Sequence, residues 1–288
     1  MLDYHVHSAY SDDSDYPMEA VVQDAIRRGI RELCFTDHVD YGVKRDWDDP
    51  RGIEYRRGDI GEPVQVANAN VDYPRYVSEL RTLQQKYRSE ITLRLGLEFG
   101  MQVHTIPAYE RLFTRYPFDF IIMSLHQIDD QEFWTQDYQR RKSQQEYNEG
   151  FYRETLRVIR RYKNYSVIGH LDSIVRYDLQ GIYPFEKRKL LLSEILKTVI
   201  RDGKGIEVNT SSHRYGLPDL TPSRDILHLY RSLGGELLTI GSDSHKPAHL
   251  GAYLRETLEE LWEMGYRRVY SFERMRPLPH EIAALLGR

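Results

Sequence analysis

The sequence predicts an α/β protein whose parallel strands close into a barrel surrounded by helices. Short β-type runs alternate with helical patterns seven or eight times along the chain, and strict alternation is typical of a parallel sheet. About eight repeats favour a closed or distorted barrel over an open sheet, and 288 residues is a normal length for one barrel. No glycine-rich dinucleotide loop follows the first predicted strand. The alternative arrangement is an open, doubly wound sheet.

Strands are predicted from short apolar runs, and helices from apolar residues spaced three or four positions apart. The first helix, at 17–29, has Pro17 near its start and Gly29 past its end. We expect strands at 2–7, 30–38, 91–99, 118–126, 165–170, 205–210 and 236–245, with a short last candidate at 267–273. We expect the other helices at 73–90, 106–116, 145–162, 184–203, 222–235 and 249–265.

Two polar segments interrupt this alternation. Residues 40–72 are rich in Asp, Arg and Gly, and their length indicates an inserted loop or lid, with a simple surface excursion as an equal alternative. A second polar insertion spans about 127–144. No segment has the composition of a linker between domains, so we expect a single domain over residues 1–288 with an inserted loop around 40–72.

Composition narrows the class of protein. Hydrophobic residues make up 40% and charged residues 29% of the chain, which allows a full core. The net charge of −4 and the absence of a basic block argue against a nucleic-acid partner. The single cysteine, Cys34, excludes an intrachain disulfide and suits a reducing compartment. No signal peptide is visible and the apolar runs are too short for a bilayer, so we expect a cytoplasmic protein without a membrane partner.

Residues that bind metals follow the ends of nearly all the predicted strands. They are His5, His7, His38, Glu98, His126, His170, Asp243 and His245, with Asp13 on the first loop and Asn209 after the sixth strand. A lone histidine at a strand end is more often a solvated residue than a ligand. In a parallel barrel, however, the carboxyl ends of all strands meet at one face, where active sites are built. The repeated placement therefore predicts one metal-binding site at that face.

The ligand types restrict the ions. Imidazole together with carboxylate suits Zn, Mn or Fe and suits Cu(I) or Ca poorly. Nine ligands exceed what one ion can use, so two or three ions sharing a bridging carboxylate are implied, as in two-metal hydrolytic sites.

Six short motifs resemble one known family. "HVHS", "TDH", "GLEFG", "SLH", "GHLD" and "GSDSH" look like those of the polymerase-and-histidinol-phosphatase (PHP) metallophosphoesterases. Their order and spacing are most similar to the monofunctional histidinol-phosphate phosphatases, from residue 2 to about residue 275. The resemblance implies the PHP fold, a distorted TIM-like (β/α)7 barrel that is one unit short of eight.

The same resemblance implies three divalent metal ions. Their ligands would be His5, His7, Glu98 and Asp243 for the first ion, Glu98, His126 and His170 for the second, and Asp13, His38 and His245 for the third. Relatives often carry histidine at the position of Asp13, and aspartate keeps a ligand there. The sequence alone does not fix the register of this loop, so Asp12 is the alternative to Asp13.

The resemblance further implies hydrolysis of L-histidinol phosphate to L-histidinol and phosphate, a step of histidine biosynthesis. We expect a hydroxide that bridges the first two ions to attack phosphorus, with Glu98, Asp243 and His245 central to catalysis. Arg176 matches an arginine of relatives, and a guanidinium suits phosphate. Relatives often read Asn-Thr-Arg after strand six, whereas here the arginine is displaced to Arg214, a second substrate-binding candidate. His213 is either a loop residue or a proton donor.

Two other functions compete with this interpretation. One is a PHP-type nucleotide phosphatase or nuclease, because a shared metal site does not encode the leaving group. The other is a barrel of the amidohydrolase type, which also begins with an HxH motif. Such enzymes usually place a carbamylated lysine on a middle strand, and strand four has no lysine here.

Overall fold

A nearly closed barrel of seven parallel strands forms the centre of the protein. The computed structural model describes residues 1–57 and 65–288. The strands follow one another around the barrel in the order β1 (Leu2–Val6), β2 (Glu32–Phe35), β6 (Thr92–Gly100), β7 (Phe120–Ser124), β10 (Val167–Ile168), β11 (Gly205–Asn209) and β12 (Leu238–Gly241). The two-residue β3 (His38–Val39) continues the path of β2 and also pairs with β6. The predicted alternating (β/α)7 fold is confirmed.

The first and last barrel strands meet across the remaining gap. Val6 and Ser244 form a parallel bridge beyond the end of β12. The backbone N–H of His7 donates to the carbonyl of Ser244 at 2.8 Å, and that of Asp243 donates to the carbonyl of His5 at 2.8 Å. These bonds bring the two ends of the sheet together, so the open, doubly wound arrangement is wrong.

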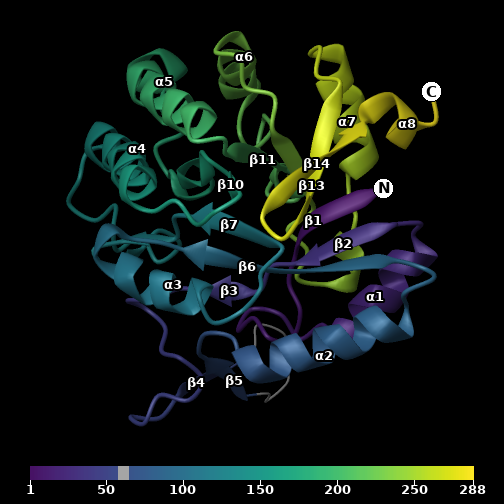
Figure 1. Cartoon of the computed structure of the whole chain (residues 1–288). Coiled ribbons are helices and arrows are strands. Elements are labelled where there is room, and N and C mark those ends of the chain that lie inside the picture. The colour runs from purple at the N-terminus through teal and green to yellow at the C-terminus, as the bar shows by residue number, and fades with distance from the viewer. Residues whose placement is uncertain (58–64) are drawn as a thin grey trace.

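Helices lie outside the barrel and follow its strands in turn (Figure 1). They are α1 (Met18–Arg27), α2 (Tyr73–Lys86), α3 (Ile106–Phe113), α4 (Gln144–Arg161), α5 (Phe185–Arg201), α6 (Arg224–Ser232), α7 (Leu254–Glu263) and the short α8 (Ile282–Leu286). At the start of α4, the Ser143 side chain and Glu146 form a reciprocal capping box. None of the described helices combines the length and apolar character needed to cross a membrane.

The core consists of the strands and the inner faces of these helices. Every residue of β1, β2, β7, β11 and β12 is buried, which is typical of parallel strands covered on both sides. Cys34 is buried in β2, as expected of a small apolar residue. Because the strand bodies are packed in this way, polar side chains reach a cavity only at the strand ends.

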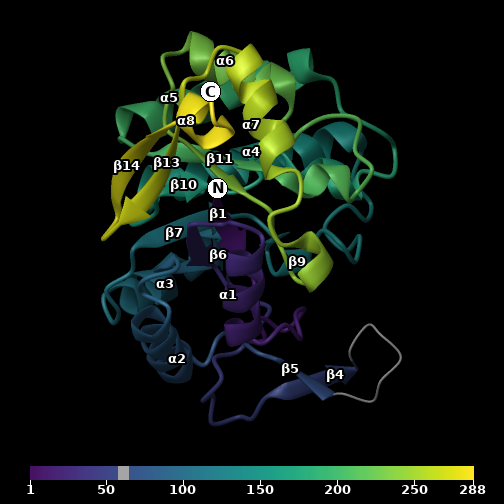
Figure 2. The ribbon, with the colours of Figure 1, turned by 90° about the vertical axis from the view of Figure 1, so that its right-hand side faces the viewer.

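Three two-stranded antiparallel hairpins stand apart from the barrel sheet. The last predicted strand is β13 (Arg268–Glu273), but it pairs with β14 (Arg276–Glu281) and adds no barrel strand. Within the predicted 40–72 insertion, β4 (Glu54–Arg57) pairs with β5 (Gln65–Asn68). Figure 2 shows these two hairpins at opposite ends of the molecule. In the second insertion, β8 (Gln127–Ile128) pairs with β9 (Gln131–Glu132).

Candidate metal centre

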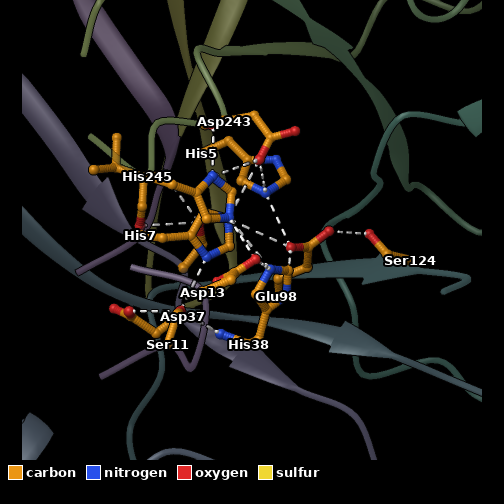
Figure 3. Close-up of polar contacts among 12 residues, drawn as sticks. His5, His7, Ser11, Asp13, Asp37, His38, Glu98, Ser124, Asp243 and His245 are labelled. Atoms are coloured by element: carbon orange, nitrogen blue, oxygen red, sulfur yellow. Dashed lines mark hydrogen bonds and ion pairs between the residues drawn. The ribbon is translucent and has the colours of Figure 1, made fainter. Parts of the chain in front are cut away.

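The residues predicted as metal ligands lie together at the carboxyl ends of the barrel strands (Figure 3). Glu98, near the end of β6, is fully buried at the centre of the group. Its Oε2 atom lies 3.1 Å from His5 Nε2, 3.1 Å from His38 Nδ1 and 3.5 Å from His7 Nε2. This oxygen therefore faces imidazoles that come from β1 and β3.

The other oxygen of Glu98 faces a different pair of histidines. Its Oε1 atom lies 2.8 Å from His170 Nε2 and 3.2 Å from His126 Nε2. The hydroxyl of Ser124 donates to the same oxygen at 2.6 Å and fixes the plane of the carboxylate. A carboxylate with its two oxygens turned toward separate sets of imidazoles has the geometry needed to bridge two ions.

A third group forms on the side of the first loop. Asp13 Oδ2 lies 3.1 Å from His245 Nε2 and 3.4 Å from His38 Nε2, and these two nitrogens are 3.5 Å apart. The neighbouring Asp12 instead lies with Oδ1 2.6 Å from Lys44 Nζ. The structure thus places Asp13 in this group and gives Asp12 a different partner.

Asp243 completes the group around β1. Its Oδ1 atom lies 3.6 Å from His5 Nε2 and 3.5 Å from His7 Nε2. The guanidinium of Arg214 donates to the backbone carbonyls of Ser242 at 2.5 Å and Asp243 at 2.8 Å. Arg214 is also absent from the described lining of the cavity. These contacts hold the loop that carries Asp243 and do not support the predicted contact of Arg214 with substrate, which stays a prediction.

The donor sets fit divalent metal ions. Four groups of histidines and carboxylates each bring their ligand atoms within 4.8 Å of one another, and together they contain all nine predicted ligands and Asp40. The Nε2 atom of His7 is buried and has no hydrogen-bond partner among the described residues, although it points at Glu98 and Asp243. A buried nitrogen without a hydrogen bond is costly unless something else, such as a metal ion, occupies its lone pair.

The electrostatics favour ionised carboxylates in this centre. Burial raises the pKa of Glu98, but His5, His126 and His38 outweigh it and hold that pKa well below the usual range. Burial also raises the pKa of Asp243, but His5 outweighs it and holds that pKa well below its usual range. Burial lowers the pKa of His126, yet Asp40 and Glu98 raise it to about 9. The same attraction holds protons on the imidazoles, and a metal ion has to displace those protons on binding, because only the neutral imidazole is a ligand.

Three carboxylates around the ligands were not found by sequence reasoning. Asp40 Oδ1 lies 2.7 Å from His126 Nδ1, Glu207 Oε1 lies 2.6 Å from His5 Nδ1, and Asp37 accepts from the Ser11 hydroxyl at 2.8 Å. The sequence held a signal for each. Asp37 and Asp40 flank the predicted ligand in "TDHVDY", and Glu207 is an acidic residue inside the buried strand "GIEVN".

The cavity beside the centre has an arginine on one wall. The Nη2 atom of Arg176 donates to Ser211 Oγ at 2.6 Å and lies 3.4 Å from Asp243 Oδ2. Its guanidinium carbon is 4.7 Å from the centroid of the Tyr215 ring, and its buried Nε has no hydrogen-bond partner among the described residues. Arg176 therefore lines the cavity directly beside Asp243, one of the predicted ligands.

The outer wall of the same cavity comes mainly from the second insertion and from loops after the later strands. It includes Glu132, Trp134, Tyr177 and Tyr215. From the described part of segment 40–72, only Asp40 and Lys44 line the cavity. Trp47 lines a different cavity, and Arg51 pairs with Asp49 at the surface. These positions do not support a lid, and residues 58–64 of the predicted insertion lie outside the described residues.

Sequence comparison relates the chain to known proteins. The profile of the PHP domain matches residues 3–211. The histidinol-phosphatase of Lactococcus lactis subsp. lactis is 29% identical over 283 residues, which cover 96% of this chain and 95% of the relative. A probable histidinol-phosphatase of Thermotoga maritima is 26% identical over 270 residues, which cover 92% of this chain and 93% of the relative.

Structural comparison agrees with these matches. A crystal structure of histidinol phosphate phosphatase from Lactococcus lactis subsp. lactis, complexed with zinc, L-histidinol and phosphate, aligns with a TM-score of 0.79 and 26% sequence identity. The alignment covers 96% of this chain and 98% of that chain. Since the PHP profile spans well over half of the sequence and the fold agrees, this chain belongs to the PHP domain family.

Proposed function

We propose that this chain is a metal-dependent phosphomonoesterase that hydrolyses L-histidinol phosphate to L-histidinol and phosphate in histidine biosynthesis. The observation that carries the proposal is the arrangement of Glu98 between two sets of imidazoles, with Arg176 on the wall of the same cavity. The Lactococcus relative, complexed with zinc, L-histidinol and phosphate, supports the same substrate for this chain. We also propose that the protein acts in the cytoplasm and that residues 1–288 form a single domain.

Three ions would use the ligands that the family pattern predicts. The geometry supports His5, His7, Glu98 and Asp243 for the first, Glu98, His126 and His170 for the second, and Asp13, His38 and His245 for the third. Bound divalent ions supply Lewis acidity, which neutralises charge on phosphoryl oxygens and lowers the pKa of water toward neutrality. Hydrolysis of phosphate monoesters depends mainly on such charge stabilisation and alignment.

Arg176, beside the predicted ligand Asp243, would bind the phosphoryl group. A guanidinium matches the geometry of phosphate oxygens and stays charged at all working pH values. Its contact with the face of Tyr215 and its bond to Ser211 hold the guanidinium plane in place before substrate arrives. Less rotational freedom is then lost on binding, which favours the aligned complex.

The outer wall suits the organic part of the substrate. L-histidinol carries an imidazole and an ammonium group. Trp134, Tyr177 and Tyr215 offer aromatic faces. Among the described lining residues, Glu132 is the one acidic residue that is neither a predicted ligand nor paired with Lys44. We propose that the aromatic side chains pack against the imidazole and that Glu132 pairs with the ammonium.

The nuclease alternative lacks an electrostatic footprint. In the part of the chain that the structure describes, the lysines and arginines that line the cavity are Lys44 and Arg176. Lys44 is already engaged, with Nζ 2.6 Å from Asp12 Oδ1 and 2.8 Å from Asp40 Oδ2. A polynucleotide needs a row of cations along its phosphates. The cavity therefore favours a small phosphate ester over a nucleic acid.

Steady-state kinetics test the proposal. The zinc-, manganese- and iron-loaded protein is assayed with L-histidinol phosphate, a series of nucleoside monophosphates and single-stranded DNA. We expect the highest kcat/KM for L-histidinol phosphate. A higher kcat/KM for any nucleotide or for DNA would overturn the assignment in favour of the alternative PHP-type activity.

A further inference from the structure

Glu207 lies behind the metal centre, on the side away from the cavity. It belongs to β11, is 1% exposed and is absent from the described cavity lining. Its Oε1 atom lies 2.6 Å from Nδ1 of His5, while Nε2 of the same imidazole faces Glu98 at 3.1 Å and Asp243 at 3.6 Å. The two ring nitrogens of His5 therefore face different groups, and Glu207 takes the one turned away from the other predicted ligands.

The second oxygen of Glu207 reaches another ligand segment. Its Oε2 atom accepts from the backbone N–H of His170 at 2.9 Å and from the Asn209 side-chain amide at 3.2 Å. The amide of Asn209 also donates to Asp243 Oδ2 at 3.2 Å. One buried carboxylate thus connects β1, the segment after β10 and, through Asn209, the loop after β12.

The backbone packs closely around this carboxylate. A Cβ atom at Gly241 would lie 2.8 Å from Glu207 Oε1 and 2.3 Å from the Cβ of His5. A Cβ atom at Gly169 would lie 3.5 Å from Glu207 Oε2. Close approach of β11, β12 and β1 therefore depends on a glycine beside the His5–Glu207 pair.

We propose that Glu207 is a positioning residue that keeps the proton of His5 on Nδ1 and leaves Nε2 free to bind the first metal ion. The pair also fixes the direction of the ring, and the bond to the His170 backbone holds a predicted ligand of the second ion in register. Carboxylates that accept from the outer nitrogen of a metal-binding histidine set its tautomer and raise its basicity. The inference rests on the metal centre of the proposed function, but not on the identity of its substrate.

The variant Glu207→Gln tests this role with little change in volume. If the glutamine oxygen accepts from His5 Nδ1, its NH2 group faces the donors of His170 and Asn209. If the amide is turned around, its NH2 group meets the protonated nitrogen of His5. The first orientation loses both contacts of Oε2 and the second loses the contact with His5, because glutamine has one acceptor oxygen where glutamate has two.

The readout is zinc affinity, measured by competition with a chromophoric chelator, with the absorption spectrum of the cobalt-loaded protein as a second signal. We expect Glu207→Gln to weaken zinc binding by about 10- to 100-fold, the range for loss of an outer partner. Glu207→Asp keeps the charge but is one methylene shorter, and it should recover part of that loss. Zinc affinity equal to wild type in Glu207→Gln would overturn the proposal.

Glu32→Gln is the matched control. Glu32 is a largely buried carboxylate on β2, the strand next to β1. It accepts from the Tyr4 hydroxyl at 2.6 Å and from Arg94 Nε at 2.8 Å without touching a predicted ligand. We expect it to lower the melting temperature while zinc affinity stays at the wild-type value. An equal loss of zinc affinity in Glu32→Gln would mean that Glu207 acts only through general stability.

A measurement on the wild-type protein covers the case in which Glu207→Gln does not fold. Nitrogen-15 NMR of the zinc-loaded protein reports which ring nitrogen of His5 is protonated. We expect the proton on Nδ1 and the metal-bound shift on Nε2; the reverse assignment would overturn the proposal. Failure of the proposed function would appear separately, as zinc binding without turnover of L-histidinol phosphate.

Discussion

Glu98 divides its two oxygens between separate partners, and this division is the main feature of the centre at the scale of single residues. Oε2 faces the imidazoles of His5 and His38, while Oε1 faces those of His126 and His170. A single carboxylate at this point can set the spacing of two ions. The same side chain is fully buried, so removing it leaves several imidazoles without a counter-charge.

Replacing Glu98 with glutamine should therefore remove metal as well as activity. We expect zinc content after dialysis to fall below the wild-type stoichiometry, and kcat to fall by more than the roughly 100-fold loss seen for an outer partner. Metal analysis and single-substrate kinetics check both. Glu90→Gln, at an exposed glutamate, is the control and should match wild type. Normal zinc content and turnover in Glu98→Gln would contradict the bridging role.

Arg176 gives a second residue-scale prediction. A hydrogen bond to a charged group contributes about 1.5–3 kcal/mol, so Arg176→Ala should raise KM and weaken inhibition by inorganic phosphate by roughly 10- to 100-fold. Arg201→Ala, which removes an exposed arginine of α5, should leave both values unchanged. Zinc content should stay normal in each variant. Unchanged phosphate inhibition in Arg176→Ala would remove Arg176 from the substrate site.

At the scale of elements, loops and not strands decide which substrate enters. The strand ends supply the predicted ligands, whereas the segment around β8 and β9 contributes Gln127, Glu132 and Trp134 to the cavity. Trp134 is 61% exposed, an unusual position for a large aromatic side chain without a ligand. Within this segment, Glu132 and Trp134 line the cavity, whereas Gln127 also donates to the carbonyl of Gly100 at the end of β6.

Glu132→Gln should change substrate preference without changing the chemistry. An ion pair at a partly exposed site contributes up to about 1 kcal/mol, so we expect KM for L-histidinol phosphate to rise about 2- to 5-fold. The kcat/KM for p-nitrophenyl phosphate, which has no ammonium, should stay constant. Asp137→Asn removes a carboxylate of the same segment that pairs with Arg140 at 2.8 Å outside the cavity, and should affect neither substrate. Equal losses on both substrates would refute the specificity role of Glu132.

For the whole molecule, the centre joins segments from both ends of the chain. Asp13, Glu98 and Asp243 lie together with histidines that range from β1 to the loop after β12. Ions that bind only the folded chain stabilise it by mass action. The barrel and its centre are therefore expected to be thermodynamically linked.

Removal of the ions should lower the melting temperature. With free zinc at about 100 times its Kd, each site adds about 2.7 kcal/mol to the free energy of unfolding, and a chelator removes that term. Differential scanning calorimetry before and after chelation measures the shift, and chelator saturated with zinc beforehand is the control. Restored zinc should restore the melting temperature. An unchanged melting temperature in a protein shown to have lost its zinc would contradict this linkage.

Much of this architecture could be predicted from the sequence, because two local signals act together. Hydrophobic periodicity identifies the alternating strands and helices, and parallel strands must end at one face, so the positions of His38 and His170 followed directly. The partners of Glu207 could not be predicted in this way. They depend on which strands lie side by side and on the space left by the missing side chain of Gly241. Neither can be predicted from the pattern of residues within one segment.

The displaced arginine and the last strand show the same limit. Arg214 follows β11 closely, but its guanidinium turns to the carbonyls of Ser242 and Asp243, and a loop conformation of this kind has no periodic signal. The run at 267–273 is a strand, as predicted, yet it pairs with β14 because the barrel already closes between β12 and β1. Local pattern predicted the element but could not choose its neighbour.

The bridge between Val6 and Ser244 also sets the order in which the molecule can be completed. His5 and His7 are synthesised first, whereas Asp243 and His245 come near the end of the chain. A nascent or truncated chain that lacks β12 holds only part of the first donor set, so its affinity for a metal ion at that position must be lower. Tight binding of all the ions thus indicates a chain in which β1 and the segment after β12 have already paired.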